Sequence, residues 1–134
     1  MKNLRTLVVD DHMDFLRLAK ALLDELEGVE LIGYAQDGEE AVRLCDKLQP
    51  DLVLMDLSMP RMGGLQATRL IQAQNKPPVV AIVSIYDDPE HREHTARAGA
   101  DAFISKADFL GSVSNLVREL TGGMDDVRVA NTGY

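Results

Sequence analysis

Short apolar segments alternate with amphipathic segments five times along the chain. The apolar runs that predict strands lie at residues 7–9, 29–35, 51–56, 79–84 and 101–106. After four of the five runs, apolar side chains recur three and four residues apart, as at Leu18, Leu22 and Leu26, which places them on one face of a helix. Strands that are apolar throughout are typical of a parallel sheet covered on both faces, so the pattern predicts an α/β fold with right-handed crossovers.

Turn and cap residues mark where several helices begin and end. Asp37 precedes a helical pattern as an N-cap, and Asp88 does the same with Pro89 at the first helical position. Gly99 is expected to end that fourth helix, and two prolines stop a third helix that covers about 64–74. The fifth helix carries an apolar stripe that begins at Phe109.

Length and charge limit the kinds of protein that the chain can be. Its 134 residues suit one domain over 1–121, and residues 122–134 carry no sustained pattern and are expected to be a flexible tail or the start of an interdomain linker. A net charge of −8 without basic clusters argues against nucleic-acid binding by this domain alone. No apolar run approaches the roughly 20 residues that span a membrane. Cys45 is the only cysteine, so we expect no intrachain disulfide and a cytoplasmic location.

Polar side chains follow the ends of four predicted strands. The first strand ends in Asp10 and Asp11, the third in Asp56, the fourth in Ser84 and the fifth in Lys106. The carboxyl ends of parallel strands form the edge at which such folds bind ligands. One residue of this kind is usually a cap or a solvated charge, but three neighbouring carboxylates repel each other and need compensation.

A divalent cation would supply that compensation. Mg²⁺ takes carboxylate oxygens, keeps several waters and adds phosphate oxygens, so three aspartates with a hydroxyl and an ammonium suit Mg²⁺ and a phosphoryl group. No histidine or cysteine stands at the strand-end positions, which argues against zinc. His12 is expected to point to solvent at the start of the first helix.

Asp56 is the candidate nucleophile, because a carboxylate can form an acyl phosphate. We expect Mg²⁺ to lie between Asp56 and the incoming phosphoryl group, with Asp11 as a direct ligand and Asp10 bound directly or through water. Lys106 should pair with Asp56 before the reaction and with a phosphoryl oxygen after it, and Ser84 should donate to another oxygen. The Asp56 carboxylate is expected to emerge at the open edge of the sheet.

Four stretches, LVVDDH, PDLVLMDLSMPRMGG, VVAIVSIYDD and GADAFISKAD, resemble the receiver domain of two-component response regulators, most closely the NarL/FixJ (LuxR-type) family. The resemblance covers about residues 4–120. It implies a flavodoxin-like doubly wound (βα)5 fold with five parallel strands in the order 2-1-3-4-5. It also implies that the domain catalyses only its own phosphorylation and dephosphorylation.

The resemblance assigns site roles position by position. The phosphoacceptor is Asp56, the Mg²⁺ ligands are Asp10, Asp11, Asp56 and the backbone carbonyl of Ser58, and the phosphate-binding and switch residues are Ser84, Lys106 and Phe103. The implied donor is a phosphohistidine of a sensor histidine kinase or phosphotransfer protein, and phosphorylation is expected to change the surface of helix 4, strand 5 and helix 5 and to allow a homodimer. Helix 4 has no Leu, Ile, Val or Phe, so its burial should be shallow.

Three positions depart from the common receiver pattern. Ala107 stands where many receivers have proline, Gly63 stands where aspartate is frequent, and Ile85 stands where a small residue is common and should crowd the phosphoryl site. The chain also ends at Tyr134 without the helix-turn-helix domain of NarL-type regulators. It is therefore expected to be either a single-domain regulator or the receiver part of a DNA-binding transcriptional regulator.

Three other functions remain open. An aspartyl-nucleophile phosphatase of the haloacid dehalogenase type has a second aspartate two residues after the nucleophile, where this chain has Ser58. A flavin-binding module needs a Ser/Thr/Gly cradle for the flavin phosphate, and the loop DDHMD lacks one. A receiver-like module that binds partners without phosphorylation is disfavoured by the complete set of strand-end residues.

Overall fold

Strands and helices alternate along residues 3–122, the part of the chain that this computed structural model describes. The strands are β1 (Leu4–Val9), β2 (Val29–Ala35), β3 (Leu52–Asp56), β4 (Val79–Ser84) and β5 (Ala102–Ser105). The helices are α1 (Met13–Asp24), α2 (Gly38–Leu48), α3 (Gly64–Gln72), α4 (Pro89–Arg97) and α5 (Phe109–Leu120), with a 3-10 turn η1 (Lys106–Asp108) before α5. All but the first residue of the predicted tail, 122–134, lies outside the described residues.

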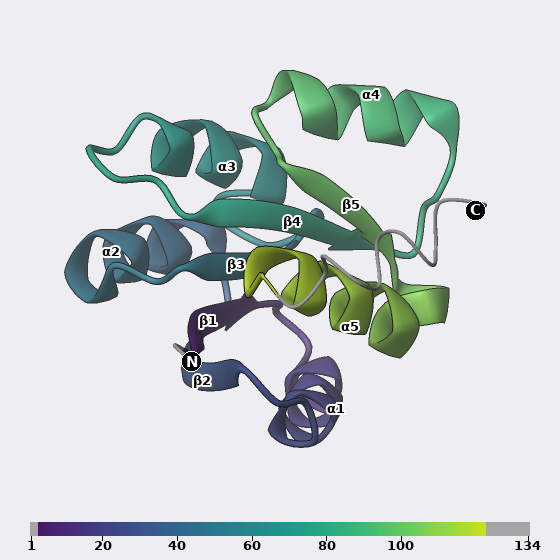
Figure 1. The fold of residues 1–134 in the computed structure, drawn as a ribbon. Coiled ribbons are helices and arrows are strands. Elements are labelled where there is room, and N and C mark those ends of the chain that lie inside the picture. The colour runs from purple at the N-terminus through teal and green to yellow at the C-terminus, as the bar shows by residue number, and fades with distance from the viewer. Residues whose placement is uncertain (1–2, 123–134) are drawn as a thin grey trace.

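The five strands form one parallel sheet in the order β2-β1-β3-β4-β5, which confirms the predicted topology (Figure 1). The register brings the carboxyl ends of the strands to the same level. Val9 of β1 lies opposite Met55 of β3, and Ser84 of β4 lies opposite Ser105 of β5. Asp10 and Asp56 therefore stand side by side, because each directly follows one of the paired residues Val9 and Met55.

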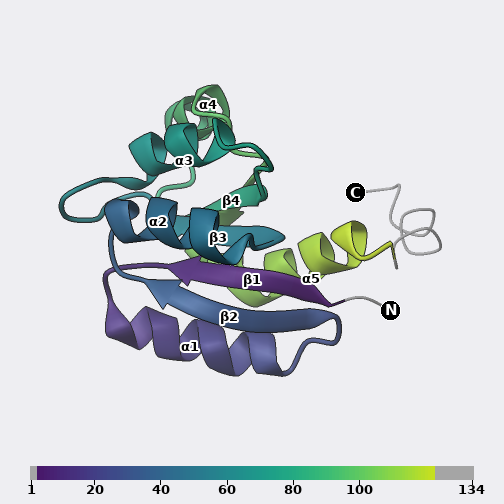
Figure 2. The ribbon, with the colours of Figure 1, turned by 90° about the vertical axis from the view of Figure 1, so that its left-hand side faces the viewer.

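Helices cover both faces of the sheet (Figures 1 and 2), and an apolar core layer lies between the sheet and the helices on each face. α1 and α5 pack on one face, against Leu52 and Leu54 of β3. α2 and α3 pack on the other face, against Val53 and Met55 of the same strand. Every residue of β3 is buried, which explains its uninterrupted apolar sequence, and each large side chain contributes about 1.5–3 kcal/mol of transfer free energy.

The predicted caps are confirmed. The Asp37 side chain accepts a hydrogen bond from the Glu40 backbone N–H at 2.8 Å, and Asp88 accepts one from the His91 N–H at 2.9 Å. Pro89 is the first residue of α4, and Gly99 follows its end with a φ of 99°, a left-handed conformation that favours glycine.

Three predicted segments are longer than the observed elements, because their end residues have other partners. β3 begins at Leu52 instead of residue 51, since the Asp51 carboxylate accepts the backbone N–H of Arg5. β5 ends at Ser105, because Lys106 begins the 3-10 turn. α3 ends at Gln72 instead of residue 74. None of the helices in residues 3–122 is long and apolar enough to cross a membrane.

Candidate functional site

The strand ends bring a cluster of ligand atoms together, as the sequence predicts. Asp10, Asp11, His12 and Asp56 each offer one oxygen or nitrogen atom, and all four atoms lie within 4.8 Å of one another. Asp10 directly follows β1 and is completely buried, and Asp56 is the last residue of β3. The three carboxylates were expected at this edge, whereas the place of His12 in the cluster was not.

Asp56 is more buried than the sequence analysis anticipated. It retains only 8% of its exposure, so its carboxylate does not emerge at an open edge. This burial, with the charge of Asp10 adding to it, raises the pKa of the Asp56 carboxyl from 3.8 to about 6, although Lys106 acts in the opposite direction. Asp56 is still predominantly ionised at neutral pH, as a nucleophilic carboxylate must be.

A cavity of about 190 Å³ opens beside Asp56. It is lined by His12, Asp56, Leu57, Ser58, Ser84, Ile85, Tyr86 and Lys106. The expected hydroxyl, ammonium and carboxylate groups therefore border one space. Ile85 is 69% exposed and forms part of its rim, and the crowding of the phosphoryl site by this side chain stays a prediction.

The predicted ion pair between Lys106 and Asp56 is present, but Lys106 lies closer to Asp10, a contact that was not predicted. Its Nζ donates to Asp10 Oδ2 at 2.8 Å and lies 3.5 Å from Asp56 Oδ1. Asp10 has no contact with solvent, so a strong donor stabilises its charge more than that of Asp56. The ammonium also lies 4.3 Å from the centre of the Phe15 ring, which holds it over the pocket.

His12 is exposed to solvent but turns one ring nitrogen toward the carboxylates. Its side chain is 70% exposed, while Nδ1 lies 3.2 Å from Asp10 Oδ1 and 3.1 Å from Asp11 Oδ1. The His12 side chain is therefore exposed to solvent, as expected, but its Nδ1 also faces the carboxylates. The contact with Asp11 does not have the geometry of a hydrogen bond, and Asp11 Oδ1 is a buried acceptor with no donor among the described residues. A cation would satisfy this oxygen, so the donor set fits a divalent metal ion.

Ser84 lies at the end of β4 and is almost completely buried. Its Oγ accepts a hydrogen bond from the Tyr86 backbone N–H at 2.9 Å. This bond fixes the position of the oxygen and leaves the hydroxyl hydrogen to donate to a group in the cavity.

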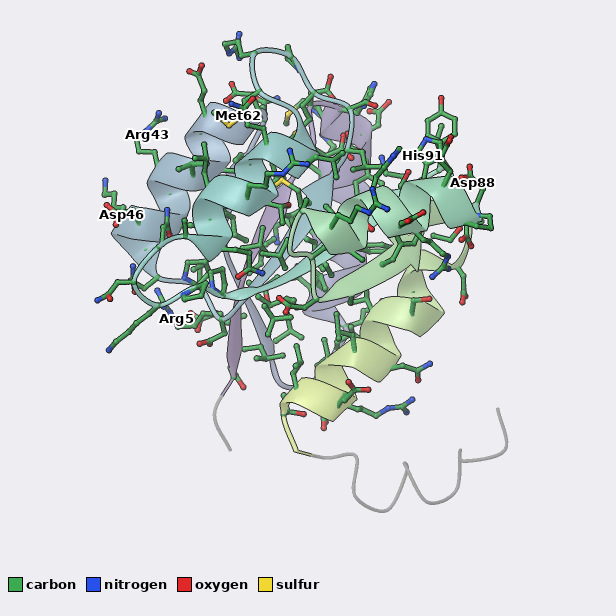
Figure 3. The ribbon with its side chains drawn as sticks, turned by 90° about the horizontal axis from the view of Figure 1, so that it is seen from above. Arg5, Arg43, Asp46, Met62, Asp88 and His91 are labelled. Carbon is green, nitrogen blue, oxygen red and sulfur yellow. The ribbon has the colours of Figure 1, made fainter. Side chains whose placement is uncertain are left out.

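Close backbone contacts fix the loop between β3 and α3, which contains Ser58. The Gly64 N–H donates to the Leu57 carbonyl at 2.8 Å, and a Cβ on Gly64 would lie 2.1 Å from the Asp56 carbonyl oxygen. The Gly38 N–H donates to the Met62 carbonyl at 2.9 Å, which joins the loop to the start of α2 (Figure 3). The sequence marks these glycines as loop residues, but their close contacts appear only in the fold.

A second link between the loop and α2 involves Arg61, which has a left-handed φ of 64°. Its Nε and Nη2 both donate to Asp37 Oδ2, at 3.0 and 2.5 Å. The hydrogen bond from the Glu40 N–H, together with these bonds from Arg61, lowers the pKa of the Asp37 carboxyl. The Asp37 carboxylate therefore caps α2 and, through Arg61, also holds the loop between β3 and α3.

Phe103 lies on β5 and is partly buried against the core between the sheet and α2–α3. The Arg92 guanidinium lies 4.6 Å from the centre of its ring, and Arg92 Nε donates to Asp87 Oδ1 at 2.5 Å. No sequence pattern indicated this contact, because Arg92 and Phe103 belong to different elements.

α4 is bound only weakly to the rest of the fold. Thr95 is its only buried residue, which confirms the predicted shallow burial. At its start, the His91 ring stacks on Tyr86 with 5.0 Å between ring centres, and His91 Nδ1 lies 2.7 Å from Asp88 Oδ2 (Figure 3). These contacts use side chains that are partly or largely exposed, so they stabilise α4 only modestly.

Known proteins resemble this chain over most of its length. A family model described as the response regulator receiver domain matches residues 6–117. The response regulator GacA of Pseudomonas aeruginosa is 33% identical over 121 residues, which is 90% of this chain and 56% of GacA. A protein-glutamate methylesterase/protein-glutamine glutaminase of Alkalilimnicola ehrlichii is 40% identical over 119 residues, 87% of this chain and 30% of that protein. The chain thus spans about half or less of the length of these relatives.

Solved structures of other proteins also resemble this chain. The response regulator domain of Thermotoga maritima CheB superposes with a TM-score of 0.81 at 29% identity, over 88% of this chain and 96% of that one. The signal receiver domain of NarL from Mycobacterium tuberculosis gives a TM-score of 0.79 at 27% identity, over 88% of this chain and 98% of that one.

Proposed function

The chain belongs to the response regulator receiver domain family, and on that premise we propose that it accepts a phosphoryl group on Asp56 and acts as the switch of a two-component phosphorelay. The family match confirms the resemblance drawn from the sequence, and NarL-type proteins are among the relatives. The observation that carries the proposal is the buried Asp56 carboxylate, which lies beside two further aspartates and Lys106 and borders an open cavity.

The donor is a phosphohistidine of a sensor histidine kinase or of a phosphotransfer protein. A carboxylate oxygen of Asp56 attacks the phosphorus atom, and the phosphorus–nitrogen bond breaks as the oxygen–phosphorus bond forms. The donor imidazole leaves with the bonding electrons and is then protonated. The product is an acyl phosphate on Asp56, and hydrolysis of this bond returns the domain to its starting state.

Each neighbour of Asp56 has a role in this step. Lys106 exchanges its contact with the carboxylates for a phosphoryl oxygen, and Ser84 donates its free hydroxyl hydrogen to another oxygen. Mg²⁺ held by Asp10, Asp11, Asp56 and the Ser58 carbonyl would neutralise the charge of the phosphoryl group when bound. The buried, unpaired Asp11 Oδ1 supports this ligand set.

The output follows from a change in the surface of α4, β5 and α5. Ser84 moves toward the phosphoryl group, and Phe103 turns inward into the space that becomes available. α4 has few buried contacts and can follow this movement at low cost. Phosphorylation therefore shifts a two-state equilibrium, and the changed surface binds a partner or a second copy of the chain.

The relatives guide the proposal for the whole protein. They include the transcriptional regulatory proteins LiaR and DegU, so we propose that the domain regulates transcription as the receiver part of a DNA-binding regulator, or acts as a single-domain regulator. The chain has a net charge of −8, and the domain is not expected to contact nucleic acid. Its place of action is the cytoplasm, where ATP-dependent kinases form the phosphohistidine.

A phosphorylation assay tests the proposal directly. Acetyl phosphate with Mg²⁺ should add about 80 Da, the mass of one phosphoryl group, and peptide mapping should place it on Asp56. Asp56→Asn should remain unlabelled, whereas Asp46→Asn, which changes an exposed carboxylate on α2, should be labelled like the wild type. Labelling of Asp56→Asn at the wild-type rate would contradict the assignment of the nucleophile.

The same assay separates the alternatives. A phosphatase would release many equivalents of phosphate from an external phosphomonoester, whereas a receiver forms one acyl phosphate per chain. A phosphorylation-independent module would bind its partner equally well in the wild type and in Asp56→Asn. The methylesterase relative matches over only 30% of its length, so its esterase activity is not carried over to this chain.

A further inference from the structure

The nitrogen of His12 is the one atom of the ligand cluster that a magnesium site does not need. We propose that His12 is a fourth ligand of the acidic pocket and makes the pocket bind borderline transition-metal ions, such as Mn²⁺, Co²⁺ and Zn²⁺, more tightly than Mg²⁺. The inference depends on the metal site of the proposed function and adds to it a residue that selects the metal.

The turn between β1 and α1 holds the imidazole in position. The His12 backbone N–H donates to Asp10 Oδ1 at 2.9 Å, which fixes the residue that bears the ring relative to the buried carboxylate. The ring nitrogen Nδ1 lies 3.2 Å from the same oxygen, to which it donates a hydrogen bond, and 3.1 Å from Asp11 Oδ1, so a bound ion would take the place of the Nδ1 proton. A metal ligand is therefore present without any change in the backbone.

The two oxygens of Asp10 face different partners. Lys106 binds Oδ2 at 2.8 Å, while Oδ1 faces His12. Asp11 Oδ1 is also on the His12 side and has no donor among residues 3–122. An ion bound between Asp10 Oδ1, Asp11 Oδ1 and His12 Nδ1 would satisfy this unpaired oxygen and leave the contact between Lys106 and Asp10 intact.

The ligand chemistry then determines the preference. Mg²⁺ favours oxygen ligands, so an imidazole adds little to its affinity. Mn²⁺, Co²⁺ and Zn²⁺ accept mixed nitrogen and oxygen ligands, and their affinity rises when imidazole joins carboxylates. Zinc was not expected, because no histidine stands at a strand end in the sequence. The turn after β1, however, brings His12 back to the edge of the sheet where the strands end.

Two other histidines serve as controls, because neither is part of a metal-ligand cluster in the described residues. His94 is exposed on α4, and His91 Nδ1 is engaged with Asp88. His94→Gln therefore removes an imidazole of the same chain without changing the pocket, and His12→Gln removes the proposed ligand without changing the net charge of neutral histidine.

The test is calorimetric titration of the whole chain with Co²⁺ and with Mg²⁺. Wild type should bind Co²⁺ at least about tenfold more tightly than Mg²⁺. His12→Gln should lose at least about tenfold in Co²⁺ affinity while Mg²⁺ affinity stays within about twofold, and His94→Gln should match wild type. The visible absorption of bound Co²⁺ should also change in His12→Gln, because a nitrogen ligand is lost.

Equal weakening of Co²⁺ and Mg²⁺ binding in His12→Gln would overturn the inference, as would an equal loss of Co²⁺ affinity in His94→Gln. The two proposals fail separately. If Asp56 is labelled with Mg²⁺ but the metal preference does not depend on His12, only the inference is wrong. If Mg²⁺ neither binds nor supports labelling, the proposed function is wrong whatever Co²⁺ does.

Discussion

The Arg92 guanidinium on α4 covers the ring of Phe103 on β5, at 4.6 Å from the ring centre. Arg92 Nε also donates a hydrogen bond to the Asp87 carboxylate. The aromatic side chain that is expected to turn inward on phosphorylation is therefore partly buried and in contact with a cation. A cation–π contact of this kind contributes about 0.5–1 kcal/mol at partly exposed sites.

Arg92→Ala should favour the phosphorylated conformation. Loss of the contact with Phe103 removes a stabilisation that belongs only to the outward state, so the two-state equilibrium should shift about two- to fivefold toward the inward state. The dissociation constant of beryllofluoride with Mg²⁺, an inert mimic of the phosphoryl group, should fall by the same factor. Arg97→Ala, which removes an ion pair with Glu93 on the same helix, should leave the constant unchanged. Weaker or equal binding by Arg92→Ala would contradict the proposed restraint.

Asp56→Asn should increase stability at neutral pH in the absence of divalent ions. The folded-state pKa of about 6 lies above the ordinary value of 3.8, so ionisation of Asp56 destabilises the fold as pH rises through this window. The amide removes this cost. Urea denaturation at pH 7.5 should show a gain on the order of 2 kcal/mol.

The pH dependence provides the control for this prediction. The gain from Asp56→Asn should shrink as pH falls through 6 and disappear near 4, where the native carboxyl is also neutral. The exposed Asp46→Asn should change stability by less than about 0.5 kcal/mol at every pH. A gain that stays constant from pH 7.5 to 4 would show that the burial of charge is not its cause.

Lys106→Met should change metal affinity and stability in opposite directions. The methionine keeps most of the apolar stem, but Asp10 loses the donor that lies 2.8 Å away. The free energy of unfolding should fall by about 1–3 kcal/mol, because a buried carboxylate is left unpaired. Mg²⁺ affinity should rise several-fold in calorimetric titration, since the positive charge of the ammonium no longer repels the ion. Lys76→Met, an exposed position before β4, should change neither quantity.

Gly64→Ala should disturb the site because it displaces the backbone of Asp56, the proposed phosphoacceptor. The added Cβ would lie 2.1 Å from the Asp56 carbonyl oxygen, so either the loop or the end of β3 must move. We expect a loss of more than about 2 kcal/mol and slower labelling by acetyl phosphate. Gly33→Ala on β2 is the matched control, because its Cβ would meet only leucine methyl groups at 3.5 Å. Equal effects of the two substitutions would mean that the close contact at Gly64 is not important.

The sequence predicted the fold well wherever a local pattern determines the outcome. β2, β4 and the start and cap of α4 agree with the predicted residues, because alternating composition, Asp88 and Pro89 act within a few positions of the chain. Boundaries failed where a distant partner intervened. Asp51 was assigned to β3, but its carboxylate binds the backbone of Arg5.

The sequence predicted which residues form the candidate site but not all of the contacts between them. Strand ends place Asp10, Asp56 and Lys106 at one edge, and this follows from topology alone. Which carboxylate the ammonium prefers depends on their relative burial, and burial is known only once the helices are packed. The same limit applies to His12, whose ring direction depends on the turn after β1.

The strand order also gives β3 and β5 different numbers of hydrogen-bonded neighbours. β3 carries Asp56 and is hydrogen-bonded to a neighbour on each side, so the proposed phosphoacceptor lies on an interior strand of the sheet. β5 carries Phe103, is the outermost strand and pairs with β4 alone. A displacement of β5 therefore disturbs one ladder of backbone hydrogen bonds instead of two. The topology therefore places the proposed phosphoacceptor on an interior strand and Phe103 on an edge strand, with β4 between them, so that β5 can be displaced while β3 keeps both of its neighbours.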